Sequence, residues 1–196
     1  MLTDAQASLQ TYLPKLVPKL ALALLAAAGA VSPAAANGDF DGLAWGAGKL
    51  DLLSRFPAAT RERFIGCNDP ASLYAKWKVD CQGYVLRGYR IGDLRFNAAF
   101  WLSAETQGLM RVSLIHNPTQ QDKARALAGC HLTFRQLVER HGEPASHDMW
   151  MTAVADHTQA EWLLPGGQTQ VSMSCVAGTA RSTIHVTYQP TTDAPR

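Results

Sequence analysis

The sequence lacks a marked net charge. Its 18 Lys and Arg residues stand against 16 Asp and Glu residues, so the formal net charge is +2 with neutral histidines. Loss of residues 1–36, argued below, would remove Lys15, Lys19 and Asp4 and leave a charge of about +1. A nearly neutral chain gives no electrostatic reason to bind nucleic acid or an anionic membrane surface. We therefore expect no nucleic acid partner and, after that loss, no membrane partner.

Sequence motifs of catalysis are also lacking. There is no GxSxG or SxxK nucleophile motif, no phosphate-cradling glycine loop, and no HExxH or HxH histidine spacing. The cysteines form neither a CxxC pair nor a tight cluster with histidine, which disfavours zinc. We therefore expect no cofactor and no metal, and we lean towards a protein that is not an enzyme.

The sequence also lacks a long hydrophobic run. The apolar stretch Leu20–Val31 is shorter than the about 20 residues that a membrane-spanning helix needs. Lys19 precedes this stretch and Ala34-Ala35-Ala36 follows it, a pattern typical of a signal peptide cleaved after Ala36. The sequence thus predicts a signal peptide over residues 1–36 and a periplasmic or secreted product.

An uncleaved membrane anchor stays as an alternative. The region before the apolar stretch is long for a signal peptide, and it contains Asp4. Against an anchor, Pro14 and Pro18 break any helical extension of the stretch towards the N-terminus. Cleavage remains the prediction, with Asn37 as the first mature residue.

The residues that are present include four cysteines, all beyond residue 36: Cys67, Cys81, Cys130 and Cys175. An even number of cysteines in an exported chain is typical of disulfides. Several pairings are open, and we favour Cys67 with Cys81 and Cys130 with Cys175. In the expected strand arrangement Cys175 falls on the inward face, where it can reach Cys130 beside a helix. The second bridge would therefore join a helix to a sheet.

The expected elements are a helix followed by strands, twice over. Apolar residues mark a short helix at 50–56, and 94–102 and 109–116 alternate between apolar and polar residues as strands do. Helical patterns then cover 119–128 and 133–141, the second opened by a capping box of Thr133 and Gln136. The remaining expected strands are 147–154, 158–164, 169–176 and 182–189.

This order predicts an α+β fold, with one or more antiparallel sheets packed on one face by short helices. We expect residues 37–196 to form a single mature domain that divides into similar halves, 37–118 and 119–196. Matching apolar residues across the turns predicts the register of the strands. The expected pairs are Phe96–Leu114, Ala98–Val112, Phe100–Met110, Ala160–Met173, Trp162–Val171, Met173–Val186 and Cys175–Ile184.

Two pairs of residues suggest a catalytic alternative. His147-Asp148 and Asp156-His157 flank an apolar strand and could bring imidazoles and carboxylates to a metal or a hydrolytic water. The stretch from Asp148 to Asp156 would span roughly 27 Å if extended, too far for one strand to gather both ends. A hairpin within the segment would revive the idea. A cell-envelope hydrolase is therefore the alternative function.

The back of the first hairpin predicts a partner-binding surface. In the expected register Trp101 lies across from Leu109, near four further residues: Arg95, Asn97, Arg111 and Ile115. Trp and Arg among small polar residues are typical of protein interfaces. The opposing interpretation is that a second helix or residues 37–48 cover this face and make Trp101 part of the core.

These observations favour an exported, disulfide-bonded, non-catalytic protein. Its expected partner is another envelope or secreted protein, which it would engage through the first sheet, for example as an inhibitor or neutraliser. A periplasmic small-molecule carrier is a third hypothesis, because five Trp and five Tyr residues could line an apolar pocket.

Overall fold

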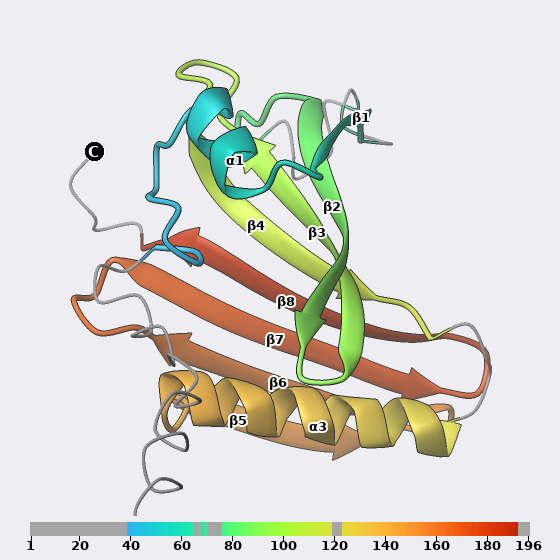
Figure 1. Cartoon of the computed structure of the whole chain (residues 1–196). Coiled ribbons are helices and arrows are strands. Elements are labelled where there is room, and N and C mark those ends of the chain that lie inside the picture. The colour runs from blue at the N-terminus through green and yellow to red at the C-terminus, as the bar shows by residue number, and fades with distance from the viewer. Residues whose placement is uncertain (1–38, 65–66, 68, 70–75, 119–122, 192–196) are drawn as a thin grey trace, which may run out of the picture. The chain divides into compact units, whose positions relative to one another are not determined.

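The computed structural model describes residues 39–64, 67, 69, 76–118 and 123–191 (Figure 1). The chain divides into two units between Pro33 and Ala34, and all of the described residues belong to the second unit. The predicted signal peptide, residues 1–36, lies outside the described residues, as does the beginning of the helix expected at 119–128.

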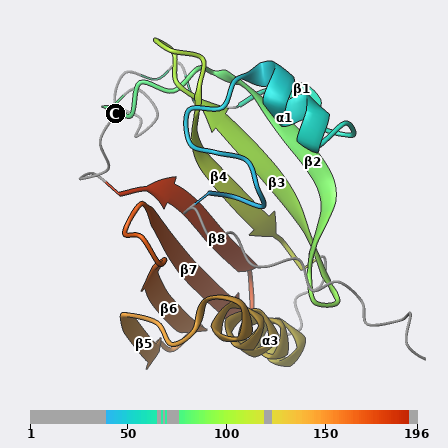
Figure 2. The ribbon, with the colours of Figure 1, turned by 60° about the vertical axis from the view of Figure 1, so that its left-hand side comes forward.

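Eight strands form one antiparallel sheet, in the order β1-β2-β3-β4-β8-β7-β6-β5 (Figure 2). Two helices accompany the sheet in the part of the chain described, α1 (Lys49–Arg55) and α3 (Lys123–His141). The molecule is therefore mostly β, and the predicted α+β class describes it only broadly. The strands are β1 (Thr60–Arg63), β2 (Gln82–Ile91), β3 (Leu94–Leu102), β4 (Leu109–His116), β5 (Ser146–Met151), β6 (Ala155–Leu163), β7 (Thr169–Gly178) and β8 (Ser182–Pro190).

The two groups of four strands join at β4 and β8. Leu114 of β4 pairs with Val186 of β8, and Ile115 pairs with His185. This pairing makes one continuous sheet from residues that lie far apart in the sequence. It also fixes which residues of the first group stand beside residues of the second.

The main core lies on one face of the sheet. Phe40, from the segment before α1, is buried at its centre, with its ring 5.0 Å from Tyr188 and 6.0 Å from Phe100, measured between ring centroids. Leu52 of α1 and Leu137 of α3 are buried in the same cluster. We call this face of the sheet the core face.

Helix α3 is a single helix where two were expected. Its buried residues recur at helical spacing, with Ala126, Cys130 and Leu137 among them. Thr133 lies inside the helix, and its hydroxyl donates a hydrogen bond to the carbonyl oxygen of Gly129 at 2.9 Å. The predicted capping box was therefore wrong, because the hydroxyl satisfies the preceding turn instead of starting a new helix. Figure 1 shows α3 running alongside β6 and β7.

The register of the first hairpin differs from the prediction by two residues. Phe100 pairs with Val112 instead of Met110, and Ala98 pairs with Leu114. A bulge after Trp101 accounts for one residue of the shift, since Trp101 pairs with Arg111 and the next residue already pairs with Leu109. The pairing next to the turn, Leu102 with Leu109, already differs by one residue from the predicted register. The other predicted pairs were correct: Ala160–Met173, Trp162–Val171, Met173–Val186 and Cys175–Ile184.

The strand predicted at 147–154 is instead the first arm of a hairpin. The backbone N–H of Thr152 donates to the carbonyl oxygen of Ala155 at 2.8 Å, and the Thr152 hydroxyl accepts the N–H of Ala155 at 3.0 Å. These bonds close a tight turn, so β5 ends at Met151 and β6 begins at Ala155.

Both disulfides have the favoured pairing, Cys67–Cys81 and Cys130–Cys175. Cys130 and Cys175 are buried in the core cluster and join α3 to β7. Cys67 belongs to a second, smaller cluster that contains Trp101. The two bridges thus belong to different clusters of the structure.

Candidate binding face

The sheet face opposite the core face carries a row of residues that cross-strand pairing places side by side. The row runs from β3 to β5 and consists of Asn97, Ile115, His185, Ser174, Gln159 and Asp148. A second row, from β8 to β5, consists of Thr183, Val176, His157 and Trp150. We call this surface the open face. Asn97, Gln159, Asp148 and Trp150 are exposed, and the others are half-buried.

His185 stands near the middle of the open face. Burial, and then the neighbouring positive charge of Arg111, lower the pKa of His185 below its ordinary value. The imidazole Nε2 lies 3.4 Å from the hydroxyl of Thr187. A neutral imidazole both donates and accepts hydrogen bonds, so His185 offers this face polar groups without adding positive charge.

Trp150 gives the open face its aromatic edge. Its ring is stacked on His157, with ring centroids 4.9 Å apart and planes within 4°. Stacking holds the indole flat at the end of the sheet, where 41% of the residue is exposed. A rigid, half-exposed indole beside short polar side chains is typical of a protein-binding surface.

Trp101, the centre of the predicted surface, is covered. It is only 6% exposed, its ring centroid lies 3.9 Å from that of Phe64, and its indole N–H donates to the Ser113 hydroxyl at 3.2 Å. The residues that cover Trp101 include Phe64, Cys67 and Val79. The Cys67–Cys81 disulfide closes the part of the chain that carries Cys67 and Val79. The covering residues named here lie outside residues 37–48, which the opposing interpretation offered beside a second helix.

Gly83 is needed for this cover. A Cβ atom at this position would lie 2.3 Å from Cε2 of Phe64 and 2.5 Å from the carbonyl oxygen of Phe100. Only glycine lets Phe64 approach the sheet so closely. The packing of Phe64 over Trp101 therefore depends on the absence of a side chain at Gly83 as well as on the Cys67–Cys81 disulfide.

The other predicted surface residues separate into three groups. Leu109 is 2% exposed and belongs to the core cluster, because the bulge turns it to the core face. The Arg111 guanidinium lies 4.0 Å from the ring centroid of Trp77, a cation–π contact. Arg95 and Asn97 are exposed and Ile115 is half-buried. These last three residues remain available to a partner, and their role stays a prediction.

The four residues of the hydrolase hypothesis divide between the two faces. A hairpin does form in the segment, but His147 stacks on Phe134 of α3 at 4.3 Å and Asp156 pairs with Lys123 at 3.2 Å. Asp148 and His157 lie on the open face. Among the described residues, no three His, Cys, Asp or Glu side chains gather as metal ligands would. The arrangement supports stacking and ion pairing.

A polar cluster ties several elements together on the core face. The Tyr89 hydroxyl donates to Asp41 Oδ2 at 2.6 Å, Arg140 donates to Asp41 Oδ1, and Arg55 Nε donates to the Asp41 carbonyl oxygen at 2.7 Å. Burial, followed by the charge of Asp41, raises the pKa of Tyr89. Tyr89 therefore stays a neutral donor, and the cluster joins the entry segment to β2, α1 and α3.

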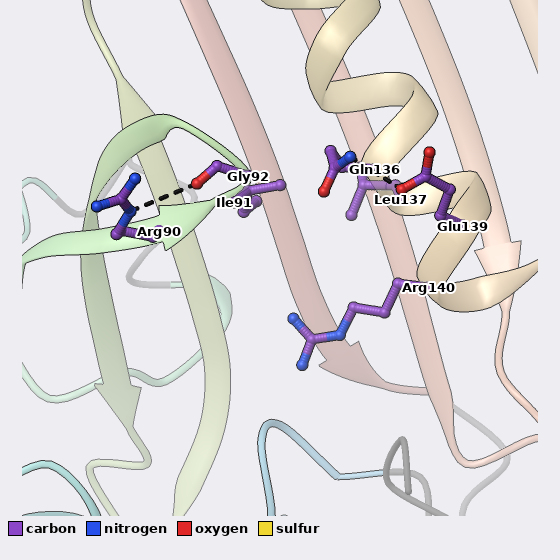
Figure 3. Close-up of a pocket in the computed structure, with 7 residues that line it drawn as sticks. All are labelled: Arg90, Ile91, Gly92, Gln136, Leu137, Glu139 and Arg140. Atoms are coloured by element: carbon purple, nitrogen blue, oxygen red, sulfur yellow. Dashed lines mark hydrogen bonds between the residues drawn. The ribbon is translucent and has the colours of Figure 1, made fainter. Parts of the chain in front are cut away.

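An open pocket of about 270 Å³ lies beside this cluster, between the β2–β3 turn and α3 (Figure 3). Figure 3 shows the hydrogen bonds from Arg90 to the Gly92 carbonyl and from Gln136 to Glu139. The lining is largely polar and charged, unlike the apolar pocket expected of a carrier. It consists of Arg90, Ile91, Gly92, Gln136, Leu137, Glu139 and Arg140.

Comparison with protein-family models, with curated proteins and with solved structures finds no match for this chain. No helix in the described ranges combines the length and the apolar character that crossing a bilayer requires. The two disulfides are consistent with an oxidising compartment outside the cytoplasm.

Proposed function

We propose that this chain is an exported, non-catalytic binding protein that engages another envelope or secreted protein through its open face. Export to the periplasm or the exterior, by way of a signal peptide over residues 1–36, is part of the proposal. Its support is the pattern of Leu20–Val31 and Ala34-Ala35-Ala36, together with the two disulfides.

The observation that carries the proposal is the contrast between the two faces of the sheet. Leu52 of α1 and Leu137 of α3 pack into the core cluster, on the core face. The open face of β6 and β5 keeps Gln159, Asp148 and Trp150 exposed. Ile115 and Val176 are apolar residues within this face and short polar side chains lie around them, an arrangement that is typical of protein interfaces.

Site-specific photo-cross-linking in cells tests the proposal. A photoreactive residue at Gln159 or Ser174, on the open face, should capture the same partner protein. The same residue at Arg135, exposed on α3, is the matched control and should not capture it. Ile115→Arg should abolish capture from Gln159 by placing a charge in the centre of the face. Equal capture from Arg135, no capture from the open face, or capture unaffected by Ile115→Arg would contradict the proposal.

A further inference from the structure

Strand β5 ends the sheet with an edge whose second half, Met149–Met151, is apolar and exposed. All six residues of β5 are exposed, and Met149 and Met151 are 65% and 82% exposed. Among the described strands, only β6 pairs with β5. Protein sheets ordinarily protect such edges with charge, proline or a covering segment, because an unpaired edge is a template for another strand.

The hydrogen bonds of the hairpin show which backbone groups of β5 are turned outward. Thr152 donates to Ala155, and Trp150 and Asp148 follow at intervals of two, opposite His157 and Gln159. In an antiparallel pair, residues that bond to the neighbouring strand alternate with residues whose N–H and C=O point away from it. The outward groups of β5 therefore belong to His147, Met149 and Met151.

We propose that β5 pairs with β5 of a second copy of this chain, antiparallel, about a two-fold axis that passes through Met149. In this register Met149 lies opposite Met149 of the second copy, and His147 lies opposite Met151. Every outward residue meets an outward residue, so each such pair exchanges both of its N–H···O bonds. The side chains of Met149 then lose water against each other.

The sequence of β5 selects this register over its neighbours. A slip by one residue sets outward groups against inward ones and breaks the hydrogen-bond pattern. A slip by two in one direction places Asp148 opposite Asp148, where like charges repel. A slip by two in the other direction leaves His147 opposite Ala153, which lies beyond the end of the strand. The selected register instead places Asp148 opposite Trp150, with no like charges facing.

The other edge of the sheet argues for a closed dimer over an open chain of copies. Strand β1 has four residues, Thr-Arg-Glu-Arg, and the carboxylate of Glu62 pairs with Arg87 at 2.6 Å. A short charged edge of this kind resists strand addition. Since β5 can pair with itself and β1 resists pairing with β5, association stops at two copies.

Sedimentation velocity over a range of concentrations, on the protein with both disulfides intact, tests the pairing. The wild-type chain should reach the mass of a dimer. Met149→Lys places two ammonium groups opposite each other and should raise the dimer dissociation constant at least about tenfold. Val154→Lys is the matched control, because Val154 is 66% exposed but lies in the turn outside the pair. It should leave the mass unchanged.

A charge-swap mixture tests the register itself. Met149→Lys and Met149→Glu should each be monomeric, whereas an equimolar mixture should form a heterodimer through a Lys–Glu pair at the two-fold axis. The proposal is overturned by a wild-type monomer at every concentration, by a dimer that Met149→Lys leaves intact, or by a mixture that stays monomeric. Circular dichroism should show both variants folded, since the side chain of Met149 points to solvent in the single copy.

Discussion

The two edge strands of the sheet, β1 and β5, differ in how they are protected from pairing with another strand. At the β1 end the edge strand is short and charged, and the adjoining open side is covered by the Cys67–Cys81 segment. At the β5 end the edge is apolar, and the disulfide, Cys130–Cys175, lies on the core side. The β1 end is thus protected by its own chain, whereas the β5 end is protected by a second copy in the proposed dimer.

The largest expected effect comes from removing the disulfide of the β5 end. The Cys130→Ala/Cys175→Ala double variant should lose about 4 kcal/mol of unfolding free energy, because the bridge closes a sequence separation of 45 residues and is buried in the core. Urea unfolding followed by far-ultraviolet circular dichroism measures the loss. A loss below that of the other double variant, described next, would contradict the comparison of the two ends.

Removing the disulfide of the β1 end should have a smaller effect on stability and a distinct optical signature. Cys67→Ala/Cys81→Ala opens a bridge across 14 residues and should cost about 3 kcal/mol. The cover should then loosen and expose Trp101, which shifts tryptophan emission to longer wavelength. The Cys130→Ala/Cys175→Ala variant, measured under native conditions, is the control, since it leaves the cover over Trp101 in place.

The charged edge can be converted to resemble the apolar one. Arg61→Ile/Arg63→Ile removes two charges from β1, so copies should associate through both edges and form species larger than a dimer. Light scattering after size-exclusion chromatography measures the mass. The conservative Arg61→Lys/Arg63→Lys variant keeps the charges and should behave like the wild type. Unchanged mass in the isoleucine variant would show that charge does not protect this edge.

The smallest expected effect is a dependence on pH at the C-terminal end of α3, where His141 contacts Tyr188 of β8. Burial, and then the charge of Arg140, lower the pKa of His141 from 6.5 to about 4. The unfolded chain therefore binds more protons than the folded chain between these values. The contribution of His141 is complete above pH 6.5 and decreases as the pH falls towards 4, by no more than about 1 kcal/mol because the ring is partly exposed.

Urea unfolding at several pH values between 4 and 7 measures this dependence. His141→Gln should flatten the profile relative to the wild type, and His131→Gln, at an exposed position of the same helix, serves as the control. The 3.0 Å contact between His141 Nε2 and the Tyr188 hydroxyl is lost in the first variant alone. Identical profiles for wild type and His141→Gln would refute the assignment.

The sequence predicts local hairpins better than it predicts the contacts between distant segments. The β6–β7 and β7–β8 registers follow from short turns, and glycines with positive φ at Gly166 and Gly167 mark the first of them. Neither the bulge after Trp101 nor the exact place of the turn before Leu109 leaves a comparable mark, and together they put the first hairpin two residues away from its true register. Bulges are set by packing on both faces, which one strand's alternation does not reveal.

The proposed binding face could be predicted only in its first half. Arg95, Asn97 and Ile115 follow from the alternation of two neighbouring strands. His185, Ser174 and Gln159 join them through the β4–β8 pair, which no turn or spacing announces. The alternation of polar residues in these strands is visible in the sequence. It indicates that the polar side chains are exposed, but it does not indicate which strand lies beside each of them. A cover over Trp101 was the opposing interpretation, but the segment that provides it was not identified, because that segment has little periodicity.

The position of β8 also governs when this sheet can form. Strand β8, the last of the described strands in sequence order, lies between β4 and β7, at the centre of the strand order. Until Ser182–Pro190 is present, β4 and β7 are two unpaired inner edges, and the slow, long-range closure of the sheet must wait for it. A chain shortened before Ser182 therefore loses the joint between its two groups of strands, and the sheet cannot close until β8 has been synthesised.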